Sequence, residues 1–182
     1  MSMAHHRATF AEINLKALKH NLQNLRAITE PATGLGPATG IMAVIKADAY
    51  GHGAIPCAKA AVDTGVEYLG AGIIEEGIEL RENNITEPIL ILGSIFPDEV
   101  ADLVHHNFAT ILCTPDLAQA LAKEAEKQGK TVNVHIKVDT GMNRLGVLPE
   151  NLLPLIKTIN NLPTLKLEAL STHFSSADDK DT

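Results

Sequence analysis

The sequence is poor in aromatic residues: its 182 residues include no tryptophan, two tyrosines and four phenylalanines. A ligand pocket in this protein would therefore be lined mainly by aliphatic and polar side chains. Long apolar runs are also missing, since none approaches the roughly 20 residues that span a membrane. The polar start, residues 1–7, does not resemble a secretory signal peptide. We therefore expect neither a membrane-spanning nor a secreted protein.

Cysteine and positive charge are also scarce. Cys57 and Cys113 lie far apart and have no metal-binding or redox spacing, so we expect two reduced thiols, no metal site and a cytoplasmic location. The net charge of -7 and the lack of a Lys/Arg cluster argue against a nucleic-acid-binding surface. No Gly-rich dinucleotide fingerprint and no phosphate-binding P-loop occur. His5 and His6 are given no role.

Short apolar segments alternate with amphipathic segments, which is typical of parallel strands connected by helices. A strand Phe10–Ile13, a helix that begins after Asn14 as its N-cap, and a Pro- and Gly-rich loop over 31–40 come before this repeat. The strands expected in the repeat are Ile41–Ile45, Tyr68–Gly72, Ile89–Leu92, Ala109–Leu112, Val132–Val138 and Lys166–Ser171. The helices expected between them are 55–63, 75–82, 98–105, 117–127 (capped by Thr114 and ended by Gly129) and 150–159.

The repeat predicts an α/β fold. Its spacing and the missing nucleotide fingerprint favour a (β/α)8 TIM-type barrel over a doubly wound sheet. The chain supplies about six of the eight strands that such a barrel needs. We therefore expect the barrel to be incomplete in this chain, with the remainder supplied by a companion segment.

Lys46 stands at the C-terminal end of the apolar run Ile41–Ile45, before a short Gly-rich turn. A buried strand presents a charged lysine more easily at its tip than in its middle. A desolvated amine has a lowered pKa and forms Schiff bases with carbonyl compounds, so Lys46 is a candidate catalytic residue. A surface lysine at a strand end is the alternative that this segment alone leaves open.

His135, Lys137 and Asp139 alternate along the fifth strand of the repeat and share one face, which points inward in a helix-covered barrel. Arg144 follows the next turn and is placed to fold back over the strand end. Two cations there need an anion between them. Asp139 and a carbamylated Lys137 are the candidates, and pairing of Lys137 with another carboxylate is the alternative.

Three further residues each have two interpretations. Arg144 is either a structural ion-pair partner or a clamp for a carboxylate or phenolate oxygen. His173, at the end of the sixth strand, is either a core histidine or a group that faces a cofactor. Tyr50, in the turn after Lys46, either donates its hydroxyl to a phosphate or packs on a helix.

Three motifs resemble those of one family. The segment Ala43–Gly53 (AVIKADAYGHG) is similar to the pyridoxal-phosphate lysine motif of alanine racemases. Lys137–Gly146 (KVDTGMNRLG) resembles the fifth-strand motif of that family, and Ser171–Phe174 (STHF) resembles the sixth-strand motif. They occur in the family's order and cover essentially the whole chain, but only the N-terminal half of a family member. The chain thus resembles the N-terminal barrel portion of an alanine racemase, a fold type III pyridoxal-phosphate enzyme.

This resemblance implies roles for five residues. Lys46 would hold pyridoxal 5'-phosphate in a Schiff base and act as one of two bases that interconvert L-alanine and D-alanine. Tyr50 would contact the cofactor phosphate. Arg144 would contact the cofactor's phenolic oxygen and the substrate carboxylate, and Lys137, carbamylated, would orient that arginine. His173 would belong to the polar network behind the cofactor ring.

The resemblance also implies what lies outside the chain. Residues 1–14 would form a strand that pairs with a C-terminal β-domain, residues 15–182 would form the partial barrel, and the β-domain itself is absent. The second base would be a tyrosine from the other subunit of a homodimer. We therefore expect a cytoplasmic bacterial enzyme that supplies D-alanine for peptidoglycan, and we expect this fragment alone to be inactive.

Two alternatives remain within the same barrel type. One is a non-enzymatic pyridoxal-phosphate carrier, which the chain length fits but the lysine motif argues against. The other is an amino-acid racemase of broader specificity, because little of the substrate pocket lies in this chain.

Overall fold

A computed structural model of the chain describes residues 9–29 and 39–180. Six strands form one sheet, in which each strand pairs in parallel with the next along the chain. They are β1 (Met42–Val44), β2 (Tyr68–Ala71), β3 (Ile89–Ile91), β4 (Ala109–Leu112), β5 (Val132–Lys137) and β6 (Leu165–Ser171). All six coincide, within one or two residues, with the strands predicted for the repeat.

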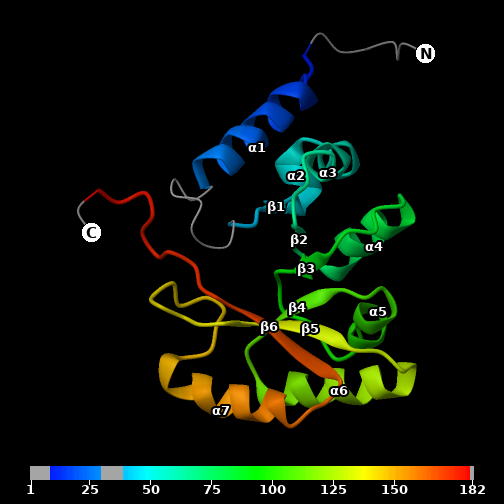
Figure 1. Ribbon diagram of the computed structural model, residues 1–182, viewed down its shortest axis with the longest axis vertical. Helices are drawn as coiled ribbons and strands as arrows, with labels where there is room; N and C mark the ends of the chain where they lie inside the picture. Colours follow the sequence, from blue (N-terminus) through cyan, green and yellow to red (C-terminus); the bar gives the residue numbers. More distant parts are fainter. Residues whose placement is uncertain (1–8, 30–38, 181–182) are drawn as a thin grey trace.

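The helices also follow the prediction. They are α1 (Leu15–Thr29), α3 (Ala54–Val62), α4 (Ile74–Glu82), α5 (Val100–His105), α6 (Pro115–Gln128) and α7 (Pro149–Asn160), and the short segment labelled α2 (Lys46–Gly51) is described below. Figure 1 shows the strands following one another from β1 to β6, with α3 to α7 arranged along the outer side of the curved sheet. Within the described ranges, none of the helices is both long and apolar enough to cross a lipid bilayer.

The caps expected from the sequence form. Asn14 Oδ1 accepts a hydrogen bond from Ala17 N at 3.0 Å at the start of α1. Thr114 Oγ1 accepts one from Leu117 N at 3.4 Å, and α6 ends at Gly129, whose φ of 63° lies in the left-handed region that glycine adopts readily. The local signals that begin and end these helices are therefore confirmed.

Alternation along the strands separates two apolar clusters. The larger one lies between the sheet and its helices and includes Ile91 and Leu112, both fully buried. A smaller one is built around Leu90, Ala109 and Ile111, which alternate with the outward-facing residues of β3 and β4 and so lie on the opposite, inner face. This is the arrangement of a barrel wall, whose interior is filled by side chains.

The predicted strand Phe10–Ile13 does not form. Residues 9–14 have no regular secondary structure, because a strand needs a hydrogen-bonding neighbour and none of the six strands lies beside them. The division of the chain at residue 14 stays a prediction. His5 and His6 lie outside the described residues, as does most of the predicted loop 31–40.

An ion pair attaches α1 to the first two strands. Arg26 donates two hydrogen bonds to the Glu67 carboxylate, at 2.9 and 3.0 Å, and Glu67 Oε2 accepts a third from Ile41 N at 2.7 Å. The Arg26 hydrogen bonds, followed by the one from Ile41, lower the pKa of Glu67 from 4.5 to about 2. Because the pKa is lower in the folded state, the stabilisation is present above pH 4.5 and is lost as the pH falls toward 2.

We predict that Glu67→Gln lowers the free energy of unfolding at neutral pH and flattens its pH dependence between pH 2 and 4.5. Urea unfolding over this pH range measures both effects. Glu126→Gln is the matched control, because the Glu126 side chain is exposed on α6. The same pH dependence in Glu67→Gln as in the parent chain would contradict the prediction.

Candidate functional site

The residues singled out in the sequence meet at the C-terminal ends of the strands, where (β/α) barrels carry their active sites. A cavity of about 380 Å³ opens there. Its lining comes from the ends of β1, β2, β3 and β5 and from the loop after β5: Lys46, Gly72, Leu92, Gly93, Ser94, Lys137, Arg144 and Leu145. Three of the predicted site residues, Lys46, Lys137 and Arg144, are thus brought together from positions nearly one hundred residues apart.

The chain directly after Lys46 adopts an unusual conformation. The segment α2 is not a right-handed helix, because its residues Ala47–Tyr50 have φ between 51° and 55° and ψ between 37° and 53°. These are left-handed dihedrals, which cost roughly 1–2 kcal/mol for each residue that carries a Cβ. Where the sequence predicted only a Gly-rich turn, the structure has one left-handed turn built from non-glycine residues.

Hydrogen bonds hold this turn in place. Ala49 N donates to Ile45 O at 2.8 Å, and Gly53 N donates to Asp48 O at 2.9 Å. Asp48 Oδ1 accepts a hydrogen bond from Ala54 N at 2.6 Å, which ties the turn to the start of α3. A strained segment at the end of a strand is a common feature of functional sites.

Glu76 is a residue of this region that the sequence reasoning missed. Its carboxylate lies in the first turn of α4 and accepts hydrogen bonds from Ala47 N at 2.7 Å and from Gly72 N at 2.6 Å. The only signal in the sequence is an acidic residue at the start of the helix after β2, which is a common helix-capping pattern.

Two glycines leave room for this arrangement. A Cβ at Gly72 would lie 3.2 Å from both Lys46 Cβ and Glu76 Oε2. A Cβ at Gly93 would lie 2.4 Å from Gly72 O, which is closer than non-bonded atoms can approach. The ends of β1, β2 and β3 therefore pack backbone against backbone, and the stem of Lys46 lies over Gly72.

The loop after β5 is closed by its own backbone and by Asp139. An isolated bridge pairs Val138 with Val147, and Asp139 Oδ1 accepts hydrogen bonds from Gly141 N at 2.9 Å and Asn143 N at 3.1 Å. These backbone donors lower the pKa of Asp139. Asp139 was one candidate for the anion between Lys137 and Arg144, but its carboxylate instead shapes the loop that carries Arg144.

The cavity therefore carries three cations without a paired acid. Among the described residues, none of Lys46, Lys137 and Arg144 forms an ion pair with a carboxylate. The alternative that Lys137 is neutralised by a carboxylate elsewhere in the described chain is thus not observed. Ser171, the register partner of Lys137 on β6, has a buried hydroxyl with no hydrogen-bond partner among the described residues. The site is suited to an anionic ligand.

Tyr50 and His173, the other two predicted site residues, do not line this cavity. Tyr50 is 60% exposed, and Lys46 Nζ lies 6.0 Å from the centroid of its ring. His173 is exposed and does not line the cavity. The neighbouring Thr172 instead joins the strand ends, since its hydroxyl bonds Thr140 Oγ1 at 2.6 Å and Val138 O at 2.9 Å. The roles assigned to Tyr50 and His173 stay predictions.

The inward face predicted for β5 is confirmed by a polar cluster. His135 is 6% exposed, and its Nε2 lies 2.9 Å from Glu168 Oε2. Tyr68 donates its hydroxyl to the same oxygen, and Asn133 donates to Glu168 Oε1 at 3.1 Å. Burial, then the hydrogen bond to Glu168, raises the pKa of Tyr68 to about 12.

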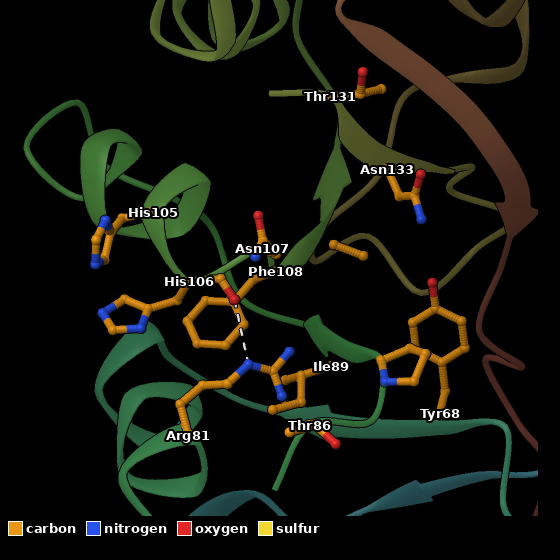
Figure 2. Close-up of a pocket in the computed structure, with 12 residues that line it drawn as sticks. Tyr68, Arg81, Thr86, Ile89, His105, His106, Asn107, Phe108, Thr131 and Asn133 are labelled. Atoms are coloured by element: carbon orange, nitrogen blue, oxygen red, sulfur yellow. Dashed lines mark hydrogen bonds between the residues drawn. The ribbon is translucent and has the colours of Figure 1, made fainter. Parts of the chain in front are cut away.

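A second cavity, of about 540 Å³, opens at the opposite, N-terminal ends of β2 to β5 (Figure 2). Arg81 reaches it but is used for structure, since its guanidinium donates to the carbonyl oxygens of His106, Ile85 and Glu87 and lies 5.2 Å from the Phe108 ring. No group of three or more His, Cys, Asp or Glu residues suited to a metal ion occurs in the described part of the chain. The cavity at the strand ends is the one that brings Lys46, Lys137 and Arg144 together.

Comparison with known proteins identifies one family. Residues 13–182 match the family model described as alanine racemase, N-terminal domain. An alanine racemase of Halothermothrix orenii is 42% identical over 175 residues, which cover 96% of this chain and 45% of that protein. One from Methanococcus maripaludis is 39% identical over 173 residues, covering 94% and 45%. The chain thus spans about half the length of the curated relatives it matches.

Solved structures show the same fold. The alanine racemase of Clostridium difficile 630 in complex with cycloserine superposes with a TM-score of 0.81 at 37% identity, covering 91% of this chain and 43% of the other. A histidine racemase from Leuconostoc mesenteroides subsp. sake superposes with a TM-score of 0.85 at 29% identity, covering 98% and 46%. The predicted fold class, an incomplete (β/α)8 barrel, is therefore confirmed.

The polar cluster around Tyr68 gives a spectroscopic prediction. The chain has two tyrosines, so Tyr50→Phe leaves Tyr68 as its only one. We expect the phenolate absorbance of the folded variant to appear near pH 12 instead of pH 10, and folding stability to fall as the pH rises between these values. Replacing Glu168 with Gln in the same background should move this titration toward pH 10. A native titration already at pH 10 would be the contrary result.

Proposed function

The chain belongs to the alanine racemase family, and we propose that it forms the N-terminal, cofactor-binding part of an enzyme that interconverts L-alanine and D-alanine. The observation that carries the proposal is the convergence of Lys46, Lys137 and Arg144 on one cavity at the strand ends, with no ion-paired carboxylate in the described ranges 9–29 and 39–180. Because the chain covers about half of its relatives, the activity proposed is that of the whole protein.

The residues present fit pyridoxal 5'-phosphate. This cofactor is an anion with an aldehyde, so its site needs an amine and cationic or hydrogen-bonding donors. Lys46 supplies the amine, the Arg144 guanidinium would face the phenolic oxygen, and the Tyr50 hydroxyl would contact the phosphate. When bound, the cofactor ring delocalises the negative charge left when the α-proton is removed.

The chain's own residues would handle one side of the reaction. Lys46 Nζ removes or returns the α-proton on one face of the substrate, and Arg144 orients the substrate carboxylate. Racemisation needs a second acid/base group on the opposite face. We place that group, a tyrosine, on the other subunit of a homodimer, in the C-terminal half that this chain does not include.

Lys137 has a separate part in this proposal. Its ammonium and the Arg144 guanidinium line one cavity, and two unpaired cations there repel each other. Carbamylation, in which the deprotonated Lys137 amine adds to carbon dioxide and releases a proton, would give a carbamate anion that pairs with Arg144 and fixes its orientation. The buried hydroxyl of Ser171 beside Lys137, which has no hydrogen-bond partner in the described part of the chain, supports an additional polar group at this position. His173 is kept in the polar network behind the cofactor.

A racemase of broader specificity is the second candidate. The likeness to a histidine racemase favours it, because the same barrel half serves a protein with that different name. The non-enzymatic carrier has no comparable support, since the relatives described above are named as racemases. D-alanine supply to peptidoglycan remains the physiological role we propose.

We predict that Lys46→Ala in the complete enzyme abolishes racemisation and the visible absorbance of the bound cofactor, because both need the lysine amine. Polarimetry with L-alanine, and with L-serine and L-histidine in parallel, measures activity and separates the specificity alternatives. Lys59→Ala is the matched control, since Lys59 is exposed on α3. Normal turnover in Lys46→Ala would exclude this role for Lys46.

The sheet edges give a prediction about the C-terminal half of the related racemases. In the described structure β1 and β6 each pair with a single strand, so both ends of the sheet present unpaired backbone groups. We expect the 182-residue chain to be inactive alone and to gain activity when co-expressed with the C-terminal half of a related racemase. Racemisation by the purified chain alone, at the rate of a complete enzyme, would contradict this prediction.

A further inference from the structure

The Glu76 carboxylate connects the ends of two neighbouring strands. Each of its oxygens accepts one backbone hydrogen bond: Oε1 from Ala47 N at 2.7 Å and Oε2 from Gly72 N at 2.6 Å. Ala47 directly follows Lys46 at the end of β1, and Gly72 directly follows β2. Hydrogen bonds from backbone N–H groups to a carboxylate are stronger than those between neutral groups.

Only one of the two bonds belongs to the helix. Glu76 is the third residue of α4, and a glutamate there often reaches back to a backbone N–H before the helix, as it does to Gly72. The bond to Ala47 serves a different segment, 29 residues earlier in the chain. Helix capping alone does not account for it.

The bond to Ala47 acts where the backbone is strained. Ala47 is the first of the left-handed residues after Lys46, so its amide is not placed as it would be in a right-handed helix. Glu76 supplies the acceptor for this amide. The neighbouring Gly72 leaves space for the Lys46 stem, because any Cβ there would meet Lys46 Cβ at 3.2 Å. The carboxylate and the glycine together determine where Lys46 leaves the barrel wall.

We propose that Glu76 is a positioning residue for Lys46: by holding the Ala47 and Gly72 amides it fixes the backbone from which the lysine amine reaches the cavity. The inference rests on the proposed function, because it assigns a purpose to the position of Lys46. Glu76 does not act on substrate itself. It forms no ion pair with Lys46 among the described residues.

Glu76→Gln is the sharpest variant. Glutamine keeps the size of the side chain but has a single acceptor oxygen, so its amide nitrogen would face one of the two backbone N–H donors. Glu76→Ala removes both acceptors. Glu75→Gln is the matched control, since Glu75 is the adjacent, exposed glutamate of the same helix turn.

The experiment compares these variants in the complete enzyme loaded with pyridoxal phosphate. We expect kcat for alanine to fall about 10-fold in Glu76→Gln and about 100-fold in Glu76→Ala, because small misplacements of a catalytic group cost this much. KM should change less than about threefold, and Glu75→Gln should match the parent. A second readout does not depend on activity: hydrogen exchange, followed by mass spectrometry, should be faster in peptides that contain Ala47 and Gly72.

Three results would decide against the inference. Faster exchange with unchanged kcat would make Glu76 a structural cap only, and unchanged exchange in both variants would show that it does not hold these amides. A rise in KM without a fall in kcat would remove the positioning role. A parent enzyme that neither binds pyridoxal phosphate nor racemises alanine would overturn the proposed function as well, whereas an active parent with active Glu76 variants overturns the role of Glu76 alone.

Discussion

The site depends on one strained turn, the left-handed segment Ala47–Tyr50 that follows Lys46. At roughly 1–2 kcal/mol for each residue, this conformation persists only where the surrounding structure opposes its relaxation. That opposition comes from both sides of the turn: Asp48 is bound to the start of α3, and the Ala47 amide is bound to the first turn of α4. The turn lets the chain leave β1 sharply, so that Lys46 stays at the strand tip while the next helix returns to the outer face of the sheet. The packing of α3 and α4 on the outer face of the sheet thereby fixes the position of the Lys46 amine at the strand ends.

The electrostatics of the cavity follow from how Asp139 is used. This carboxylate is the acid nearest in sequence to Lys137 and Arg144, yet its oxygen is occupied by backbone amides of the loop. Folding the loop around its own acid presents Arg144 at the strand ends and leaves the cations of the cavity without an ion-paired carboxylate in the part of the chain that the structure describes. In a protein with a net charge of -7, a pocket lined by two lysines and an arginine is a local reversal of sign, and it favours anionic groups such as a bound ligand and the carbamate proposed at Lys137. The ligand site thus depends on the position of Asp139 as well as on the positions of the two lysines and the arginine.

The sequence predicts much of the fold and part of the site, for identifiable reasons. Apolar alternation and caps such as Asn14 and Thr114 are local signals, and the six strands and their helices follow from them. The left-handed turn was missed because a single aspartate, which tolerates positive φ, stands between alanines and a tyrosine, which rarely adopt it. Glu76 was missed because its contact with Ala47 exists only once the segment α2 and the helix α4 are side by side. Phe10–Ile13 has the composition of a strand, but a strand forms only where a partner is present.

The distribution of exposure separates the central strands of the described sheet from its two edge strands. On the central strands the apolar side chains are covered, as at Ile91 and Leu112, which are fully buried. On the two edge strands they are not: Val44 on β1 is 38% exposed and Leu170 on β6 is 55% exposed. Lys46 lies two residues after β1, whose only strand neighbour in the described sheet is β2. A single base reaches only one face of a planar reacting carbon. The racemase activity that we propose needs a second acid/base group on the opposite face, and the uncovered edge strands leave room for a further polypeptide segment that would bring it.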